Sequence, residues 1–461
     1  MNNKLLDPIF LKKLKKIYSS NTLLTDPNSC WAYGSDNSRR HALADAVCFA
    51  TQETQVQDTV LLCNDYHIAI TTRGRATGTT GAAVPSTGGL VLSLERFKSN
   101  LTIDAANRIA VVSPGVTNQE LQDAAAKQGF FWPPDPTSAA FCTIGGNLAY
   151  NSAGPRAVKY GTPRENTLGL RAITGAGELL KTGGHTTKNV VGYDLTRLLI
   201  GSEGSLAITT EAILKLTPLP AQKRLLQAIY SDIHAAANAV AEIMAQPLIP
   251  YSLEFIDGQA INMIRDYSKT DLPRDAGAML LIEVDGEADF IDHAVKQISN
   301  AASNMGLLSI THADSAEKSQ ALWETRKALS PALRKIAPKK INEDVVVPVS
   351  NIPALIQALE NLSKKFNITI VNFGHAGNGN IHVNLLIDPD DPKQKHNAEL
   401  CLAEVFSKVI ELNGSLSGEH GIGLEKKPFL GYQLDAIAIE LMRKLKTVFD
   451  PNLILNPDKT P

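Results

Sequence analysis

Two glycine-rich runs near the C-terminal end of the chain carry residues that could bind a metal. Residues 374–382 read GHAGNGNIH and place His375 and His382 seven positions apart. Glycine at this density disfavours a helix, so the apolar residues on either side predict two strands joined by a Gly-Asn-Gly-Asn turn. Such a turn can bring both imidazoles toward one point.

The second run, residues 417–423, reads SGEHGIG and adds Glu419 and His420. Two imidazole nitrogens and one carboxylate oxygen suit a divalent transition metal that keeps an open coordination position. For a single histidine, a structural role in a turn is the commoner alternative. The presence of two glycine-rich runs with histidines in one chain favours a functional role for these histidines.

A third run could bind an anion. Residues 73–81 read RGRATGTTG and lie between two predicted strands. The spacing matches neither a GxGxxG loop followed by a helix nor a P-loop. Closely approachable backbone N–H groups, threonine hydroxyls and two arginines form an anion-binding nest. A tight turn with positive φ is the structural alternative, and this run alone does not decide between the two.

Composition excludes several classes of protein. The length of 461 residues suggests about three units of ~150 residues or two large ones. Lysine and arginine number 45 against 47 acidic residues, so no basic field exists for nucleic acid. Five scattered cysteines without a CxxC pair indicate a reducing, cytoplasmic compartment rather than disulfides or a zinc knuckle. No apolar run approaches the ~18 residues of a membrane span.

The expected elements follow from apolar periodicity. Leu6, Phe10, Leu14 and Ile17 predict a first helix that packs one face on the body. The alternative is a peripheral contact with the inner face of a membrane, and a signal peptide is not expected. The predicted strands are 58–63, 69–72, 90–94, 108–112, 225–230, 251–256, 278–284, 307–310, 345–349 and 368–372. The predicted helices are 118–128, 233–245, 289–305, 351–365 and 434–448. Beyond Pro218 and Pro220, strands alternate with helices, which predicts a sheet covered by helices.

Several blocks of the first half occur in a characteristic order. The loop at 73–81 is followed by PPDPT (133–137), TIGGN (143–147), NSAG (151–154), GYD (192–194) and LIGSEGSLAI (199–208). Over residues 40–218 this order resembles the FAD-binding domain of the vanillyl-alcohol-oxidase/PCMH flavoprotein superfamily. Arg75 and Ala76 stand where that superfamily usually has small residues, often glycine. Members that tether FAD use a histidine near this loop; none lies between His67 and His185, so FAD is expected to be noncovalent.

The resemblance implies a set of FAD-binding residues. Those implied near the pyrophosphate are Arg73, Gly74, Arg75, Ala76, Thr77, Gly78 and Thr79. Those implied near the flavin and ribityl chain are Pro134, Thr137, Gly145, Gly146, Asn147, Ser152 and Gly154, with Gly204 and Ile208 at the adenine side.

The histidine runs resemble the C-terminal half of the FAD-linked 2-hydroxyacid dehydrogenases, a group that includes the glycolate oxidase D subunit, D-lactate dehydrogenases and D-2-hydroxyglutarate dehydrogenase. This resemblance implies that His375, His382 and Glu419 bind zinc, manganese or iron and that His420 is the catalytic base. It also implies two further roles. Arg326, in the frame Trp323–Lys327 at the start of a predicted helix, would bind the substrate carboxylate, and Asn456 in the tail LILNP would return to the flavin. Asn378 departs from the usual aspartate.

The expected fold is α+β. It comprises an N-terminal helical segment (1–40), a PCMH-type FAD-binding domain (41–218), an α/β, ferredoxin-like substrate domain with the metal site (219–420), and a C-terminal helical segment returning to the FAD domain (421–461).

The expected function is oxidation of a small D-2-hydroxy acid to the 2-oxo acid, by metal-assisted proton abstraction and hydride transfer to flavin N5. A quinone, a cytochrome or an electron-transfer flavoprotein would accept the electrons, and a homodimer is compatible with the sequence. The alternatives are a non-catalytic or electron-transferring subunit of a glycolate oxidase-like complex and a metal-dependent hydrolase. An NAD-linked dehydrogenase would require a GxGxxG loop with a downstream acid.

Overall fold

The computed structural model describes residues 6–265, 272–313, 315–336 and 338–460, which form two compact units. The first unit is assembled from Met1–Ala153, Gly161–Leu219 and Glu419–Pro461. The second consists of Gly154–Tyr160 and Pro220–Gly418. The domain boundaries at 40, 218 and 420 stay predictions, and residues 1–5 of the first predicted segment lie outside the described residues.

The first unit contains a small sheet with the order β1-β2-β4-β3, in which β2, β4 and β3 are parallel. Its strands are β1 (Leu23–Leu24), β2 (Ala46–Phe49), β3 (Ile70–Arg73) and β4 (Leu90–Ser93). Its helices are α1 (Pro8–Ile17), α2 (Pro27–Trp31) and α3 (Glu53–Tyr66). Phe10 and Leu14 of α1 are fully buried in the core of this sheet. The prediction of a first helix packed by one face is therefore confirmed.

The predicted strand at 58–63 is wrong, because these residues lie within helix α3. The run Thr59-Val60-Leu61-Leu62 favours a strand by its side chains alone. The buried positions Val56, Val60 and Cys63 are spaced at helical intervals, however, and they pack on the same core as α1. Tertiary packing thus overrides local propensity here.

A second, antiparallel sheet of the first unit has the order β5-β6-β10-β8-β9. Its strands are β5 (Leu101–Asp104), β6 (Ile109–Val112), β8 (Thr167–Thr174), β9 (Leu179–Gly183) and β10 (Ala207–Lys215), and β7 (Phe130–Phe131) pairs separately with β11 (Thr217–Pro218). The accompanying helices are α4 (Asn118–Ala126), α5 (Ile144–Tyr150) and α7 (Leu195–Leu199). Trp132, Leu121 and Ile144 are fully buried in the core that these elements share.

The second unit is built on a sheet with the order β15-β12-β14-β13-β17-β18-β16, whose neighbouring strands are all antiparallel. The strands are β12 (Gln222–Tyr230), β13 (Ser252–Asp257), β14 (Ala278–Gly286), β15 (Leu307–His312), β16 (Lys339–Val346), β17 (Thr369–Gly374) and β18 (Asn380–Ile387). The helices are α6 (Ala157–Tyr160), α8 (Ile233–Ala245), α9 (Gly258–Ile264), α10 (Ile291–Ala302), α11 (Ala316–Ile336), α12 (Ile352–Phe366) and α13 (Pro392–Glu411), with 3-10 turns η2 (Val349–Asn351) and η3 (Ala376–Asn378).

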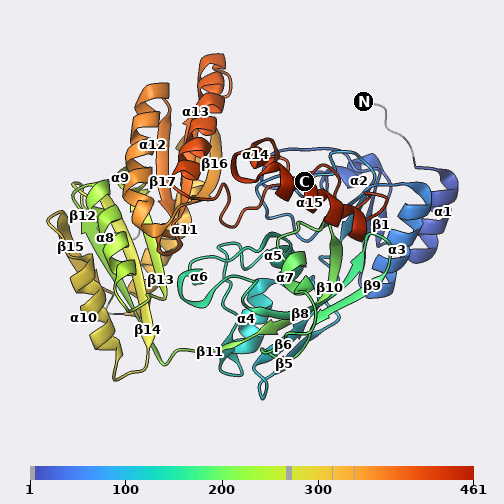
Figure 1. The fold of residues 1–461 in the computed structure, drawn as a ribbon, viewed down its shortest axis with the longest axis horizontal. Coiled ribbons are helices and arrows are strands. Elements are labelled where there is room, and N and C mark those ends of the chain that lie inside the picture. The colour runs from blue at the N-terminus through green and yellow to red at the C-terminus, as the bar shows by residue number, and fades with distance from the viewer. Residues whose placement is uncertain (1–5, 266–271, 314, 337, 461) are drawn as a thin grey trace. The chain divides into compact units, whose positions relative to one another are not determined.

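Helices cover both faces of this sheet. Helices α8, α10, α12 and α13 pack side by side on one face (Figure 1), and α9 and α11 share a core with the other. Because both faces are buried, residues 278–284 are apolar almost without interruption rather than alternating. The order β15-β12-β14-β13 is that of a ferredoxin-like βαββαβ unit, as predicted. Trp323–Lys327 lies inside α11 rather than at its start, which corrects that prediction.

The C-terminal segment contains η4 (Lys427–Phe429), α14 (Leu430–Gln433) and α15 (Ala436–Phe449). Beyond α15 the chain extends the small sheet of the first unit, where Ile70 and Leu455 form a parallel bridge. The Ile70 N–H donates to the Ile454 carbonyl at 2.7 Å, and the Asn456 N–H donates to the Ile70 carbonyl at 2.8 Å. The last residues therefore complete a sheet that the first hundred residues begin.

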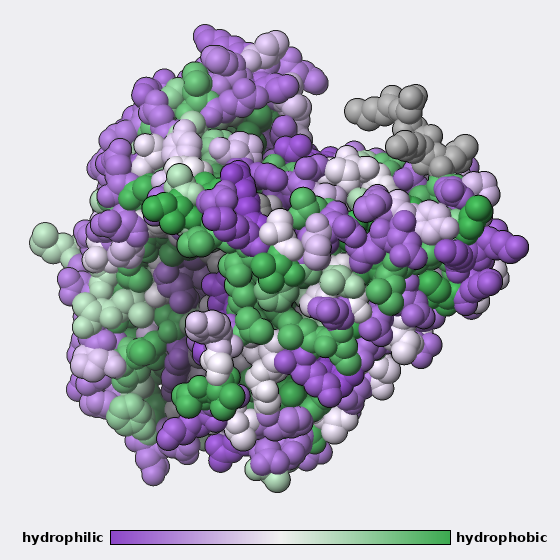
Figure 2. Space-filling view, turned by 45° about the vertical axis from the view of Figure 1, so that its right-hand side comes forward, coloured by the Kyte–Doolittle hydropathy of each residue, from purple (hydrophilic) through white to green (hydrophobic). Residues whose placement is uncertain are grey.

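The surface is mixed in character. Hydrophilic residues cover much of the face seen in Figure 2, with apolar residues between them, in keeping with 20% charged residues. Within the described part of the chain, no helix has the length and apolar character needed to cross a membrane.

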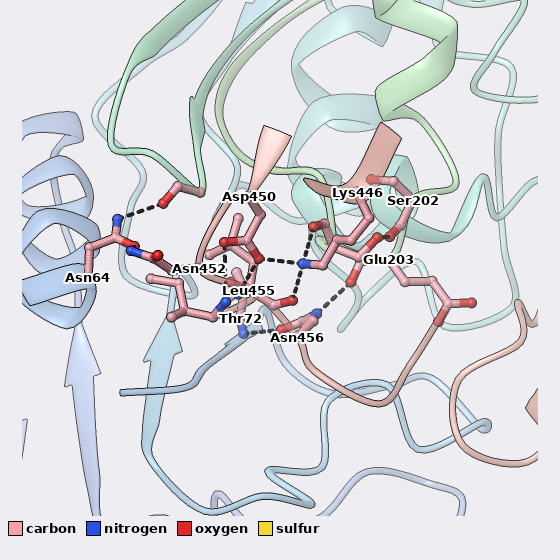
Figure 3. Close-up of polar contacts among 12 residues, drawn as sticks. Asn64, Thr72, Ser202, Glu203, Lys446, Asp450, Asn452, Leu455 and Asn456 are labelled. Carbon is pink, nitrogen blue, oxygen red and sulfur yellow. Dashed lines mark hydrogen bonds and ion pairs between the residues drawn. The ribbon is translucent and has the colours of Figure 1, made fainter. Parts of the chain in front are cut away.

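Asp450, which is fully buried, holds this C-terminal segment in place (Figure 3). Its carboxylate accepts hydrogen bonds from the N–H groups of Ile454 at 3.1 Å and Leu455 at 2.8 Å and pairs with Lys446. We expect Asp450→Ala to lower the free energy of unfolding by about 3 kcal/mol, because a buried cation and two donors lose their acceptor. Chemical denaturation followed by circular dichroism measures the change.

The matched control is Glu440→Ala on the same helix. Glu440 pairs with Lys444 at 3.7 Å in an exposed position, so its removal should cost at most ~0.5 kcal/mol. Equal effects of the two substitutions would contradict the assigned anchoring role of Asp450.

Candidate functional site

The loop 73–81 is shaped by close packing against helix α5. A Cβ at Gly74 would lie 2.2 Å from the Oγ1 of Thr143, so only glycine fits there. Thr143 is the N-cap of α5, and its hydroxyl accepts from the Gly146 N–H at 3.3 Å. The sequence thus brings two of the blocks implied to bind FAD into direct contact.

Ala76 and Arg73 show how this loop differs from a glycine-only loop. Ala76 has φ +50°, a left-handed conformation that costs a residue with a Cβ roughly 1–2 kcal/mol. This conformation is a physical reason for the glycine usual in similar flavoproteins. The Arg73 Nη1 donates to the Tyr33 carbonyl at 2.8 Å, and burial lowers the pKa of this guanidinium. This nitrogen of Arg73 therefore stabilises the fold by binding the backbone of Tyr33.

Unpartnered polar atoms lie beside this loop. Among the described residues, the hydroxyls of Thr71, Thr72 and Thr79 are buried without a hydrogen-bond partner. A cavity of about 590 Å³ adjoins the loop, lined by Asn37, Arg75, Ala76, Thr77, Glu95, Ser138 and Phe141. A ligand rich in phosphate and hydroxyl groups would supply the missing hydrogen bonds, so these residues fit FAD.

The other residues implied to bind FAD are placed in different ways. Asn118 ties two of them together, because its Nδ2 donates to the Pro134 carbonyl at 3.0 Å and to the Asn147 Oδ1 at 3.2 Å. Ile208 is buried in the core beside Ile70 and therefore supports the site rather than facing a ligand.

Four further implied residues differ in their surroundings. Gly145 packs against Pro114, Thr137 is exposed, Ser152 is half-buried, and Gly154 belongs to the second unit.

Gly204 and Asn456, far apart in sequence, are neighbours in the first unit. A Cβ at Gly204 would lie 3.1 Å from the Asn456 Nδ2, and the Asn456 Oδ1 accepts from the Thr72 N–H at 2.8 Å. Figure 3 shows Asn456 between Thr72 and Glu203. The tail therefore does reach the end of β3, where the glycine-rich loop begins.

The segment that follows His420 is anchored by Glu203. This buried carboxylate accepts from the Ile422 N–H at 2.5 Å and from the Gly423 N–H at 2.9 Å. Burial raises the pKa of Glu203 to about 7, although the two backbone donors act in the opposite direction. The Thr80 hydroxyl also donates to the His420 carbonyl at 3.1 Å. The position of His420 in the first unit is thus fixed through its backbone.

The two histidines of the second unit converge as the turn predicts. His375 follows β17, His382 lies in β18, and their ring centroids are 5.2 Å apart at 83°. The turn requires glycine at position 379, which has φ +75° and where a Cβ would lie 1.8 Å from the Val347 carbonyl oxygen. Both imidazoles are largely buried, at 6% and 7% exposure.

Glu254 of β13 links His375 to Arg326. The His375 Nδ1 lies 2.6 Å from one carboxylate oxygen, and the Arg326 Nε donates to the other at 2.7 Å. Burial by itself would raise the pKa of the Glu254 carboxyl, but His375 and Arg326 outweigh it and hold that pKa below its usual value. The Arg326 guanidinium also lies over the Phe373 ring, 4.9 Å from its centroid.

Asp344 fixes the chain just before Glu419. Its buried carboxylate accepts from the Gly418 N–H at 3.0 Å and from the Ser417 hydroxyl at 3.1 Å. Asp344 is also the register partner of His382. Glu419 is joined to Gly418 by a peptide bond, and the atoms that His375, His382 and Glu419 could offer to a cation lie within 4.8 Å of one another.

Glu254, Asp344 and Glu203 were not predicted as part of the site. Glu254 and Asp344 lie at buried positions of strands β13 and β16. An acidic residue next to apolar residues in a predicted strand is the signal that could have revealed them. Glu203 lies inside the block 199–208, which was recognised for its glycines.

Comparisons with known proteins agree with this geometry. The family model "FAD binding domain" matches residues 44–183, and "FAD linked oxidases, C-terminal domain" matches residues 219–460. The glycolate oxidase subunit GlcD of Bacillus subtilis (strain 168) is 40% identical over 91% of this chain and 89% of that protein. A D-lactate dehydrogenase of Anaerostipes hadrus is 32% identical over 98% of this chain and 97% of that protein.

The fold also resembles the crystal structure of p-cresol methylhydroxylase with substrate bound, at a TM-score of 0.79 and 16% identity over 97% of this chain and 95% of that one. This likeness confirms the expected PCMH-type architecture. The chain belongs to the FAD-linked oxidases, and its cofactor is FAD.

Gly74→Ala tests the cofactor loop. The added Cβ would displace Thr143 and with it the start of α5, so we expect the purified protein to retain less FAD than the wild type. The ratio of flavin to protein absorbance measures retention. Gly184→Ala is the control, because a Cβ there meets nothing within 4 Å. Equal flavin content in the two variants would contradict the packing argument.

Proposed function

We propose that this chain oxidises a small D-2-hydroxy acid of the glycolate, D-lactate or D-2-hydroxyglutarate type to the corresponding 2-oxo acid. FAD is bound noncovalently, and a divalent zinc, manganese or iron ion is held by His375, His382 and Glu419. The convergence of two buried imidazoles with one carboxylate in an FAD-linked oxidase carries this proposal.

The relatives support the choice of substrate class. One is a subunit of glycolate oxidase and another is a D-lactate dehydrogenase. Both names denote a substrate with a hydroxyl on the carbon next to a carboxylate. Two imidazoles and one carboxylate leave coordination positions at which such a substrate could bind through its hydroxyl and carboxylate oxygens.

A cation held by His375, His382 and Glu419 would lower the pKa of the substrate hydroxyl, and FAD would accept the hydride of the carbon that bears this hydroxyl. His420 takes the hydroxyl proton as the general base. Arg326 binds the substrate carboxylate through its terminal nitrogens, because its Nε is engaged by Glu254. The electrons leave to a quinone, a cytochrome or an electron-transfer flavoprotein.

The His420→Ala variant tests the assigned base. Without a proton acceptor, we expect anaerobic reduction of the bound flavin by 2-hydroxy acids to slow about 10²- to 10⁴-fold, with an unchanged flavin spectrum. Stopped-flow absorbance measures the rate over a panel of D- and L-2-hydroxy acids. Reduction at the wild-type rate would refute the role of His420.

The same panel separates the two candidate functions. Reduction of the wild-type flavin by at least one D-2-hydroxy acid supports the enzyme. If no 2-hydroxy acid reduces the wild-type flavin, the result would favour a non-catalytic or electron-transferring subunit. This alternative is retained because one relative is named as a subunit of glycolate oxidase.

The metal is tested by His382→Ala. Losing one of three ligands should release the cation, so we expect this variant to lack the metal that elemental analysis finds in the wild type. Chelation of the wild type should stop flavin reduction, and adding the metal back should restore it. His234→Ala is the control, since that imidazole pairs at the surface with Glu360. Turnover that survives complete removal of metal would exclude the metal role.

A further inference from the structure

Glu254 is one of several acidic residues of the second unit that are almost completely buried. It is 1% exposed and lies in the middle of β13 between Leu253 and Phe255, which are also fully buried. Removing a carboxylate from water costs several kcal/mol unless specific partners compensate. Its two partners here are His375 and Arg326, one on each oxygen.

We propose that Glu254 is a positioning residue that fixes the ring orientation and the tautomer of His375 for metal binding, and that Arg326 holds Glu254 in the orientation this requires. The proposal rests on the metal site of the proposed function. It assigns to Arg326 a second task besides the binding of substrate.

The tautomer follows from the hydrogen-bond chemistry. An ionised carboxylate only accepts hydrogen bonds, so the His375 Nδ1 that faces it carries the proton. The His375 Nε2 is then the nitrogen with a lone pair for a cation. Ligating histidines are commonly oriented by a carboxylate in this way, and loss of the carboxylate typically weakens metal binding by about 10- to 100-fold.

Arg326 determines which side-chain atom at position 254 faces His375. Its Nε–H is always a donor, because a guanidinium does not lose its proton in proteins. The oxygen that faces Arg326 must therefore remain an acceptor. A glutamine at position 254 would turn its single oxygen toward Arg326 and present its NH₂ group to His375. The imidazole would then be driven to carry its proton on Nε2, which is the nitrogen needed by the metal.

This reasoning yields a test with a rescue. We expect Glu254→Gln to weaken the binding of Zn²⁺ by about 10- to 100-fold. The double variant Glu254→Gln with Arg326→Met should recover most of that loss, since methionine has no donor and the amide oxygen can turn toward His375. Equilibrium dialysis of the FAD-containing full-length protein against Zn²⁺, with elemental analysis, measures affinity independently of activity.

The control is Glu360→Gln, which alters the surface contact of Glu360 with His234 at 3.2 Å and should leave Zn²⁺ affinity unchanged. Circular dichroism and the flavin spectrum check that each variant is folded. A double variant as weak as Glu254→Gln would overturn the tautomer argument, because loss of packing alone predicts no recovery. Unchanged affinity in Glu254→Gln would overturn the positioning role while leaving the metal site intact. A wild type that binds no Zn²⁺, Mn²⁺ or Fe²⁺ would instead overturn the metal site itself.

Discussion

Two buried carboxylates hold the ends of the short segment that carries Glu419 and His420. Asp344 accepts from the N–H of Gly418, and Glu203 accepts from the N–H groups of Ile422 and Gly423. Because these bonds reach the backbone, they fix the course of the chain on either side of Glu419 and His420. A segment so rich in glycine has little side-chain surface of its own to pack, so its conformation depends on these acceptors.

The sequence allowed the glycine-rich features to be predicted because their constraints are local. The turn between β17 and β18, and the loop that follows β3, follow from glycines placed between apolar runs. Helix α3 was missed because its β-branched residues favour a strand, and only packing against α1 reveals its helical periodicity.

The partners of the functional residues could not be predicted in the same way. Glu254 and His375 are 121 positions apart and meet only because β13 and β17 are neighbours in the sheet. A single acid in an apolar strand shows that it needs a partner, but the sequence does not show which one. The order of strands decides that, and it depends on packing across the whole unit.

The two units contain different residues of the candidate site. Both share their architecture with a p-cresol methylhydroxylase that is only 16% identical, so the fold by itself specifies neither substrate nor reaction. The second contains His375, His382 and Arg326 of the candidate site, and the first contains Glu419 and His420.

The first unit is assembled from three separate stretches of the chain, and this affects the order in which the protein can fold during translation. Leu455 completes a sheet whose other strands are synthesised among the first hundred residues. During translation, the β3 edge of that sheet stays open until Leu455 has left the ribosome. The second unit is almost wholly encoded by one continuous stretch and can mature earlier. A nascent chain halted before residue 450 would therefore carry the whole of the second unit but an incomplete first unit.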